Sequence, residues 1–210
     1  MTASYEMSAK VRSAEENGER ERERYVQLCV LCALSRRCGL DKCGKKNLIM
    51  DYQIPTGTRI GHVHLKVADL HRALGFYRDL LGFELQQFYG ENAAFISAGG
   101  YHHHIGLNTW YSKNGPPAPR HAAGLFHTAI LYPTRKDLAI VVKRLILAKY
   151  PLTGASDHGV SEAIYLDDPD GNGVELYWDR PKDQWPTDEK GNIQMVTEPL
   201  ALDELLKLAD

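Results

Sequence analysis

Two histidines and one glutamate have residue types and positions that suit metal chemistry. His62 begins one strand-like segment, in Gly-His-Val, and His127 begins another, in Phe-His-Thr. Glu175 lies in a third such segment, Gly-Val-Glu-Leu-Tyr. Two imidazoles and one carboxylate can occupy one face of an octahedron and leave three positions open, as in non-haem Fe(II) oxygenases. A lone strand histidine is usually a polar structural residue, so the inference depends on its recurrence in a duplicated unit.

The segments that carry these residues follow the same order twice. Hydrophobic periodicity predicts, in the first half, a strand at 60–67, a helix at 69–82 and strands at 83–88, 93–98 and 102–110. In the second half it predicts a strand at 125–132, a helix at 137–149 and strands near Leu152 and at 163–166 and 173–178. This internal repeat indicates an α+β fold built from two βαβββ modules. We place the modules at 57–112 and 124–180, with a linker at 113–123 and a tail with a short helix at 181–210.

The first 50 residues differ in composition from the rest of the chain. They contain an alternating run of glutamate and arginine and all four cysteines, Cys29, Cys32, Cys38 and Cys43. Their spacing favours untethered thiols over a structural zinc site, which needs two closely spaced ligand pairs. We expect residues 1–50 to be a poorly ordered extension, and one interpretation is that Met50 is the native start.

The composition argues against several classes of partner. The 25 basic and 27 acidic residues give a net charge of -2, which favours neither nucleic acid nor an anionic membrane. No apolar run approaches the roughly 20 residues of a membrane span, and the start does not resemble a secretory signal or a transit peptide. We therefore expect a cytoplasmic protein, a homodimer, without nucleic-acid or membrane partners.

Three longer motifs resemble a known superfamily. Residues 61–70 (GHVHLKVADL), 76–83 (FYRDLLGF) and 168–177 (DPDGNGVELY) are similar to the glyoxalase/bleomycin-resistance/extradiol-dioxygenase proteins, also called the vicinal oxygen chelate superfamily. Within it they most resemble the catechol-2,3-dioxygenase-like proteins, and the match covers about residues 57–186. The resemblance implies paired βαβββ modules that form an open metal-holding cup. It also implies that His62, His127 and Glu175 are the metal ligands.

The resemblance further implies residues that move protons. Extradiol dioxygenases cleave a small catechol-like aromatic with Fe(II) and O2, assisted by two histidines and a tyrosine. By position, the tyrosine matches Tyr165 and one histidine matches His158. The other histidine comes from the last strand of the first module, where His103 is the best match for the acid/base. Strand alternation is expected to place His102 and His104 on the face opposite His103.

Two other functions occur on the same fold. Glyoxalase-type isomerases or lyases with Ni(II), Zn(II) or Co(II) take a fourth ligand, a carboxylate, from the last strand of the first module, whereas residues 101–112 contain no Asp or Glu. Drug-binding proteins of the bleomycin-resistance type need no metal ligands, so the His-His-Glu set argues against them. We therefore predict an extradiol dioxygenase with Fe(II), and with Mn, Ni or Zn as alternative metals.

Overall fold

The structure is a computed structural model that describes residues 52–209. The chain divides into two compact units after Thr58. In the first unit the described residues form a turn, in which the Thr58 N–H donates to the Pro55 carbonyl at 2.9 Å. The predicted extension at 1–50, with its cysteines and Met50, lies outside the described residues. None of the helices described is long and apolar enough to span a bilayer.

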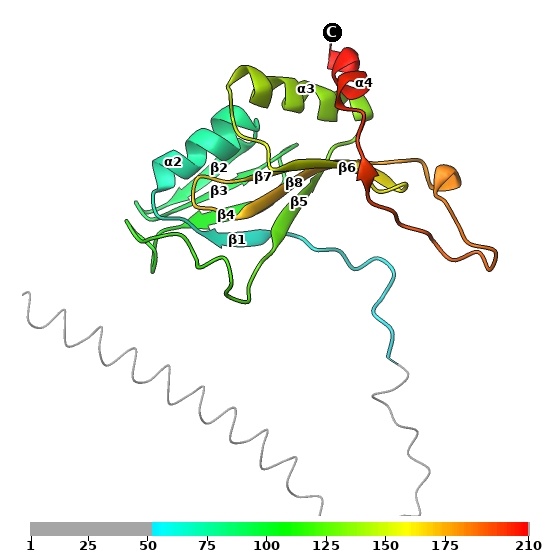
Figure 1. Cartoon of the computed structure of the whole chain (residues 1–210). Helices are drawn as coiled ribbons and strands as arrows, with labels where there is room; N and C mark the ends of the chain where they lie inside the picture. Colours follow the sequence, from blue (N-terminus) through cyan, green and yellow to red (C-terminus); the bar gives the residue numbers. More distant parts are fainter. Residues whose placement is uncertain (1–51, 210) are drawn as a thin grey trace, which may run out of the picture. The chain divides into compact units, whose positions relative to one another are not determined.

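The second unit begins with a β-α-β-β-β module (Figure 1). Its elements are β1 (Val63–Lys66), α2 (Leu70–Leu74), a π-helical continuation η1 (Gly75–Leu80), β2 (Glu84–Tyr89), β3 (Ala93–Ser97) and β4 (Ile105–Asn108). The strands form one sheet in the order β1-β4-β3-β2, with β1 parallel to β4 and the other pairs antiparallel. The Asp69 side chain caps α2 by accepting the Arg72 N–H at 2.9 Å.

The same order repeats in a second module. Its elements are β5 (His127–Leu131), α3 (Arg135–Leu147), β6 (Gly154–Asp157), β7 (Ser161–Asp167) and β8 (Gly173–Asp179). They are followed by η2 (Lys182–Gln184), β9 (Glu198–Pro199), α4 (Leu202–Leu206) and η3 (Lys207–Ala209). The sheet order is β5-β8-β7-β6-β9, with β5 parallel to β8. The predicted α+β fold is confirmed.

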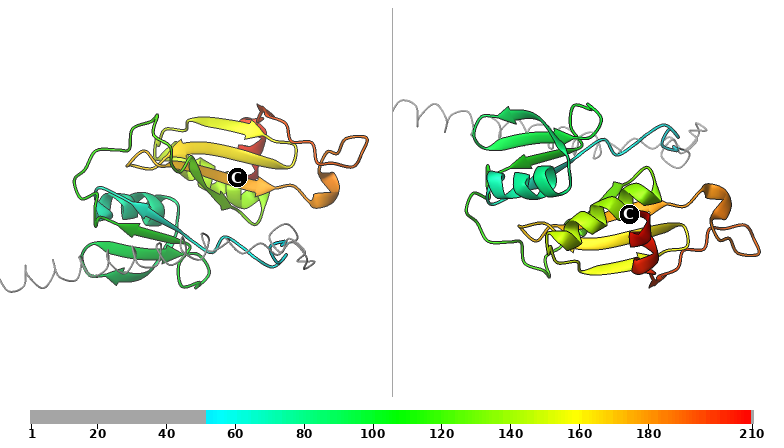
Figure 2. Two further views of the ribbon diagram at one scale, coloured as in Figure 1. Left: turned by 90° about the horizontal axis from the view of Figure 1, so that it is seen from below. Right: turned by 90° about the horizontal axis from the view of Figure 1, so that it is seen from above.

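The helices cover one face of each sheet and leave the other face open. Figures 1 and 2 show α2 and α3 on the same side of the two sheets. In β8 the side chains of Val174 and Leu176 are buried, while Glu175 and Tyr177 are half-buried. Since side chains alternate along a strand, the apolar pair faces the helices and Glu175 lies on the opposite face. Burying each apolar side chain contributes roughly 1.5–3 kcal/mol and fixes which face carries the polar residues.

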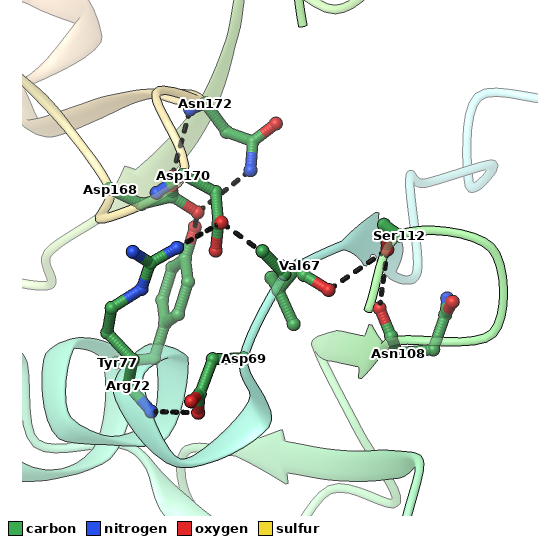
Figure 3. A network of polar contacts seen from close by, with 10 residues as sticks. Val67, Asp69, Arg72, Tyr77, Asn108, Ser112, Asp168, Asp170 and Asn172 are labelled. Atoms are coloured by element: carbon green, nitrogen blue, oxygen red, sulfur yellow. Dashed lines mark hydrogen bonds and ion pairs between the residues drawn. The ribbon is translucent and has the colours of Figure 1, made fainter. Parts of the chain in front are cut away.

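The turn between β7 and β8 connects the two modules (Figure 3). The Tyr77 hydroxyl donates to Asp168 Oδ2 at 3.0 Å, and Arg72 pairs with Asp170. The Ala68 N–H also donates to Asp170 Oδ1 at 3.1 Å. Both aspartates are buried, at 4 % and 8 % exposed. The Asp-Pro-Asp-Gly-Asn-Gly motif thus both reverses the chain and attaches the second module to the helix of the first.

Two element boundaries differ from the predicted ones in ways that affect the site. His62 precedes β1, because the strand ladder begins with the Val63 N–H donating to the His104 carbonyl at 3.0 Å. The last strand of the first module covers only 105–108, since Gly99 and Gly100 have φ values of 64° and 73° and turn the chain before it. The three-histidine run therefore lies in a loop, and its predicted place in a strand was wrong.

Candidate active site

His127 and Glu175 meet on the helix-free face of the second sheet. The β5–β8 register pairs His127 with Gly173 and Ala129 with Glu175, so the two side chains come from adjacent strands. His127 Nε2 lies 2.9 Å from Glu175 Oε2. Glycine is needed beside the histidine, because a Cβ at Gly173 would lie 2.2 Å from the Phe126 carbonyl oxygen. The Gly-Val-Glu sequence therefore provides both the room and the carboxylate.

Tyr165 and His158 extend this pair into a hydrogen-bonded chain. The β7–β8 register places Tyr165 opposite Glu175, and the Tyr165 hydroxyl lies 3.2 Å from Glu175 Oε1. His158 Nε2 lies 2.6 Å from the same hydroxyl. Burial and, next, the Glu175 carboxylate raise the pKa of Tyr165 to about 12. The phenol therefore keeps its proton at neutral pH. Four of the six predicted site residues are thus brought together.

The other two predicted site residues, His62 and His103, contact each other. Their ring centroids are 4.4 Å apart, and the His103 ring also contacts Phe95 at 4.9 Å. Burial and, next, the neighbouring imidazoles of His62 and His102 hold the pKa of His103 below its usual value. A neutral imidazole at neutral pH is consistent with a group that accepts a proton.

Ring stacking, and not strand alternation, distinguishes the members of the three-histidine run. The Tyr101 ring contacts His102 at a centroid distance of 4.0 Å and His104 at 4.8 Å. The Ala98 N–H lies 3.3 Å from His104 Nδ1. His102 Nδ1 is also 2.8 Å from His103 Nδ1. The two residues therefore contact each other, whereas they were expected to lie on opposite faces of a strand. The alternation argument was wrong because these residues lie in a loop.

A metal ion fits part of this arrangement. His127 Nε2 and the Glu175 carboxylate converge as one nitrogen and one oxygen donor, which suits a divalent transition metal. His127 Nδ1 is buried and has no hydrogen-bond partner among residues 52–209, whereas metal-bound histidines usually donate from the second ring nitrogen. Across the same residues no three His, Cys, Asp or Glu side chains are gathered closely enough to hold a metal. Two of the three predicted ligands are therefore together, and His62 lies beside His103.

Gly106 is a site position that the sequence did not reveal. The β1–β4 register pairs His64 with Gly106, as the β5–β8 register pairs Ala129 with Glu175. Gly106 is therefore the counterpart of Glu175 in the first module. A Cβ at Gly106 would lie 2.9 Å from His64 Cδ2, so an imidazole covers the position where the second module has a carboxylate. Recognising this requires the register, which the sequence does not contain.

A family match covers all six predicted site residues. Residues 59–176 match the sequence model of the Glyoxalase/Bleomycin resistance protein/Dioxygenase superfamily. The chain belongs to this superfamily. The first module, the second module as far as Leu176 in β8, and the β7–β8 turn lie within the matched range, as do the His127–Glu175 pair and its hydrogen-bonded neighbours.

Curated members of the superfamily that resemble the chain include dioxygenases. A catechol-2,3-dioxygenase from Bacillus subtilis (strain 168) is 47% identical over 100 residues, which are 47% of this chain and 35% of that protein. Biphenyl-2,3-diol 1,2-dioxygenase 3 from Rhodococcus globerulus is 32% identical over 127 residues, or 58% of this chain and 63% of that protein. The chain therefore matches less than two thirds of the length of each.

Solved structures of superfamily members share the fold. A glyoxalase/dioxygenase from Nostoc punctiforme superposes with a TM-score of 0.51 at 17% identity, covering 62% of this chain and 99% of that one. A glyoxylase/bleomycin resistance protein/dioxygenase domain from Frankia sp. EAN1pec gives a TM-score of 0.50 at 22% identity, covering 59% and 98%. At these identities the likeness concerns the fold alone.

Proposed function

We propose that the chain is an extradiol dioxygenase that opens a catechol-like aromatic ring with Fe(II) and O2. The observation that carries the proposal is the continuous chain of polar contacts from His158 through Tyr165 to Glu175 and His127. Ring opening requires proton transfers next to a metal. These contacts join His158 and Tyr165, which can move protons, to Glu175 and His127, which can bind a metal. The names of the Bacillus and Rhodococcus relatives support the substrate class.

In this proposal His62, His127 and Glu175 hold the metal. The convergence of His127 and Glu175 supports two of the assignments. His62 is exposed and precedes β1, so strand pairing does not fix its position, and its ring would have to turn from His103 to join the other two. A bound Fe(II) would supply the redox chemistry that joins an aromatic diol to O2. Mn, Ni and Zn are the alternative metals for the same donor set.

The remaining site residues would act on protons of the substrate. His103 would accept a proton from a catechol hydroxyl and later return it, as the acid/base. Tyr165 keeps its own proton at neutral pH and can therefore donate a hydrogen bond to a substrate oxygen. His158, which contacts the Tyr165 hydroxyl, would set the direction of that donation.

Gly106 argues against a glyoxalase-type isomerase. Such an enzyme takes a fourth carboxylate ligand from the last strand of the first module, and Gly106 is the counterpart of Glu175 in that strand. Glycine offers no ligand, and the His64 ring lies where a side chain at this position would begin. A site with three protein ligands leaves room for both a diol and O2, which supports the dioxygenase.

The test is reconstitution of the full chain with Fe(II) under anaerobic conditions, followed by exposure to air with a panel of catechols. We expect O2 uptake and a yellow ring-opened product from at least one catechol. Protein loaded with Zn(II) is the control, because it keeps the ligand set and removes the redox chemistry. Absence of product with iron would contradict the proposal. Isomerisation of the glutathione–methylglyoxal adduct by Ni(II)- or Zn(II)-loaded protein would favour the glyoxalase-type function.

A further inference from the structure

We propose that the strap, defined as residues 194–199, orients His158 and fixes which of its ring nitrogens carries the proton. The inference rests on the proposed function, because it assigns a positioning element to the same site. The strap follows η2 and a hairpin at 186–194 and ends in β9, which Figure 1 shows beside β6. None of its residues is among the six predicted site residues, and its Thr197 hydroxyl lies 3.5 Å from His158 Nδ1. Its role would be to hold a residue that contacts the reacting groups.

Val196 makes two backbone contacts that hold His158. The Val196 N–H donates to the His158 carbonyl at 3.1 Å. The Val196 carbonyl lies 2.8 Å from His158 Nδ1. Since a carbonyl oxygen can only accept, Nδ1 must carry a proton in this contact. In the neutral ring, Nε2 is then the acceptor, and it faces the Tyr165 hydroxyl.

The strap is itself held in place on both sides of this contact. On the C-terminal side of Val196, β9 pairs with β6, with Ser156 opposite Pro199 and Asp157 opposite Glu198. On the N-terminal side of Val196, the Gln194 N–H donates to the Pro186 carbonyl at 2.8 Å and closes the hairpin. The Val196 carbonyl is thus fixed by strand pairing and by a closed turn.

The chain around His158 is shaped to receive the strap. Gly159 has a φ of 75°, and a Cβ there would lie 2.9 Å from Pro186 Cγ and 3.4 Å from Val196 Cγ2. Its N–H donates to Asp157 Oδ1 at 2.8 Å, and Asp157 Oδ2 accepts from Arg180 at 2.6 Å. Arg180 therefore supports the turn on one side, and the strap closes against it on the other.

The position of the His158 proton decides where the Tyr165 proton goes. The phenol has one proton and two neighbours, His158 Nε2 at 2.6 Å and Glu175 Oε1 at 3.2 Å. With the proton on Nδ1, neutral His158 and the Glu175 carboxylate are both acceptors, so the Tyr165 hydroxyl can donate to either of them or to a substrate oxygen that takes their place. With the proton on Nε2, His158 would donate to the Tyr165 oxygen and could no longer accept the phenol proton. The strap therefore selects the first arrangement.

The experiment measures the His158 tautomer in ¹⁵N-labelled, metal-free full chain by long-range ¹H–¹⁵N correlation spectra, with His158→Gln used for assignment. We expect the wild type to show the Nδ1–H tautomer alone. Gly159→Ala, whose Cβ meets Pro186, should populate both tautomers. In the iron-loaded protein it should lower kcat by roughly 10- to 100-fold, with KM little changed, the range typical of removing a supporting contact.

Two variants separate positioning from general strain. Gly191→Ala is the control, because Gly191 has a φ of 80° but nothing within 4 Å of its Cβ position. It should keep the wild-type tautomer and kcat. Adding Pro186→Ala to Gly159→Ala removes the close contact and should restore both. An Nε2–H tautomer in the wild type, or the same change in Gly191→Ala, would overturn the inference. Absence of ring cleavage in the wild type would instead overturn the proposed function.

Discussion

Replacing Tyr77 with Phe tests the link between the two modules. The Tyr77 side chain is fully buried, and its hydroxyl donates to the carboxylate of buried Asp168 at 3.0 Å. Burial and, next, the Asp168 carboxylate raise the pKa of Tyr77, so the hydroxyl is a donor at any ordinary pH. A hydrogen bond to a charged group contributes about 1.5–3 kcal/mol. Because the Asn172 side chain also donates to Asp168 Oδ2, at 2.9 Å, we expect a loss near the lower end, about 1.5–2 kcal/mol.

Urea unfolding measures this loss as a shift in the midpoint at constant m-value. Tyr150→Phe is the matched control, since its hydroxyl donates to the Asp167 carbonyl, a neutral acceptor, at 2.8 Å. It should lose only about 0.5–1.5 kcal/mol. A loss below about 0.5 kcal/mol for Tyr77→Phe would refute the reasoning, because it is less than a neutral hydrogen bond contributes. Equal losses in the two variants would refute the special weight given to the charged acceptor.

Three further predictions concern the site. His103→Ala should retain iron and lose roughly 10²- to 10⁴-fold in kcat, as expected for a positioned acid/base, whereas His102→Ala should lose far less; a larger loss in His102→Ala would exchange their roles. Tyr165→Phe should retain iron and lower kcat by roughly 10- to 100-fold, and unchanged kcat would remove the phenol from the mechanism. The double variant Gly106→Glu/His64→Ala places a carboxylate where the imidazole now lies, so it should suppress ring cleavage. His64→Ala alone is the control. Equal turnover in the two variants would contradict the placement of Gly106.

The duplicated pattern was sufficient to predict the two βαβββ modules and the strands that carry His127 and Glu175. Alternating apolar residues place Val174 and Leu176 against the helices, so they also determine that Glu175 faces the other way. His62 directly precedes β1 and His127 begins β5, so the first histidine of each repeat lies at the start of the first strand of its module. These features depend on local periodicity, which a sequence contains.

Features that depend on the pairing between distant segments were not predictable. The relation between His64 and Gly106 follows from the β1–β4 register, and the contact between His158 and Val196 follows from the C-terminal chain returning to β6. The three-histidine run was assigned to a strand because its neighbours alternate. The positive φ values at Gly99 and Gly100 instead turn the chain and place it in a loop.

The metal content of ligand variants tests the central claim most directly. Full-length protein would be loaded with Fe(II) anaerobically, desalted and analysed for bound iron, with His62→Ala, His127→Ala and Glu175→Gln compared with wild type. His71→Ala is the matched control, because His71 is an exposed imidazole on α2, away from the predicted ligands. We predict stoichiometric iron in the wild type and the control and a large loss in all three ligand variants. Full iron in Glu175→Gln or in either histidine variant would contradict the proposed metal site.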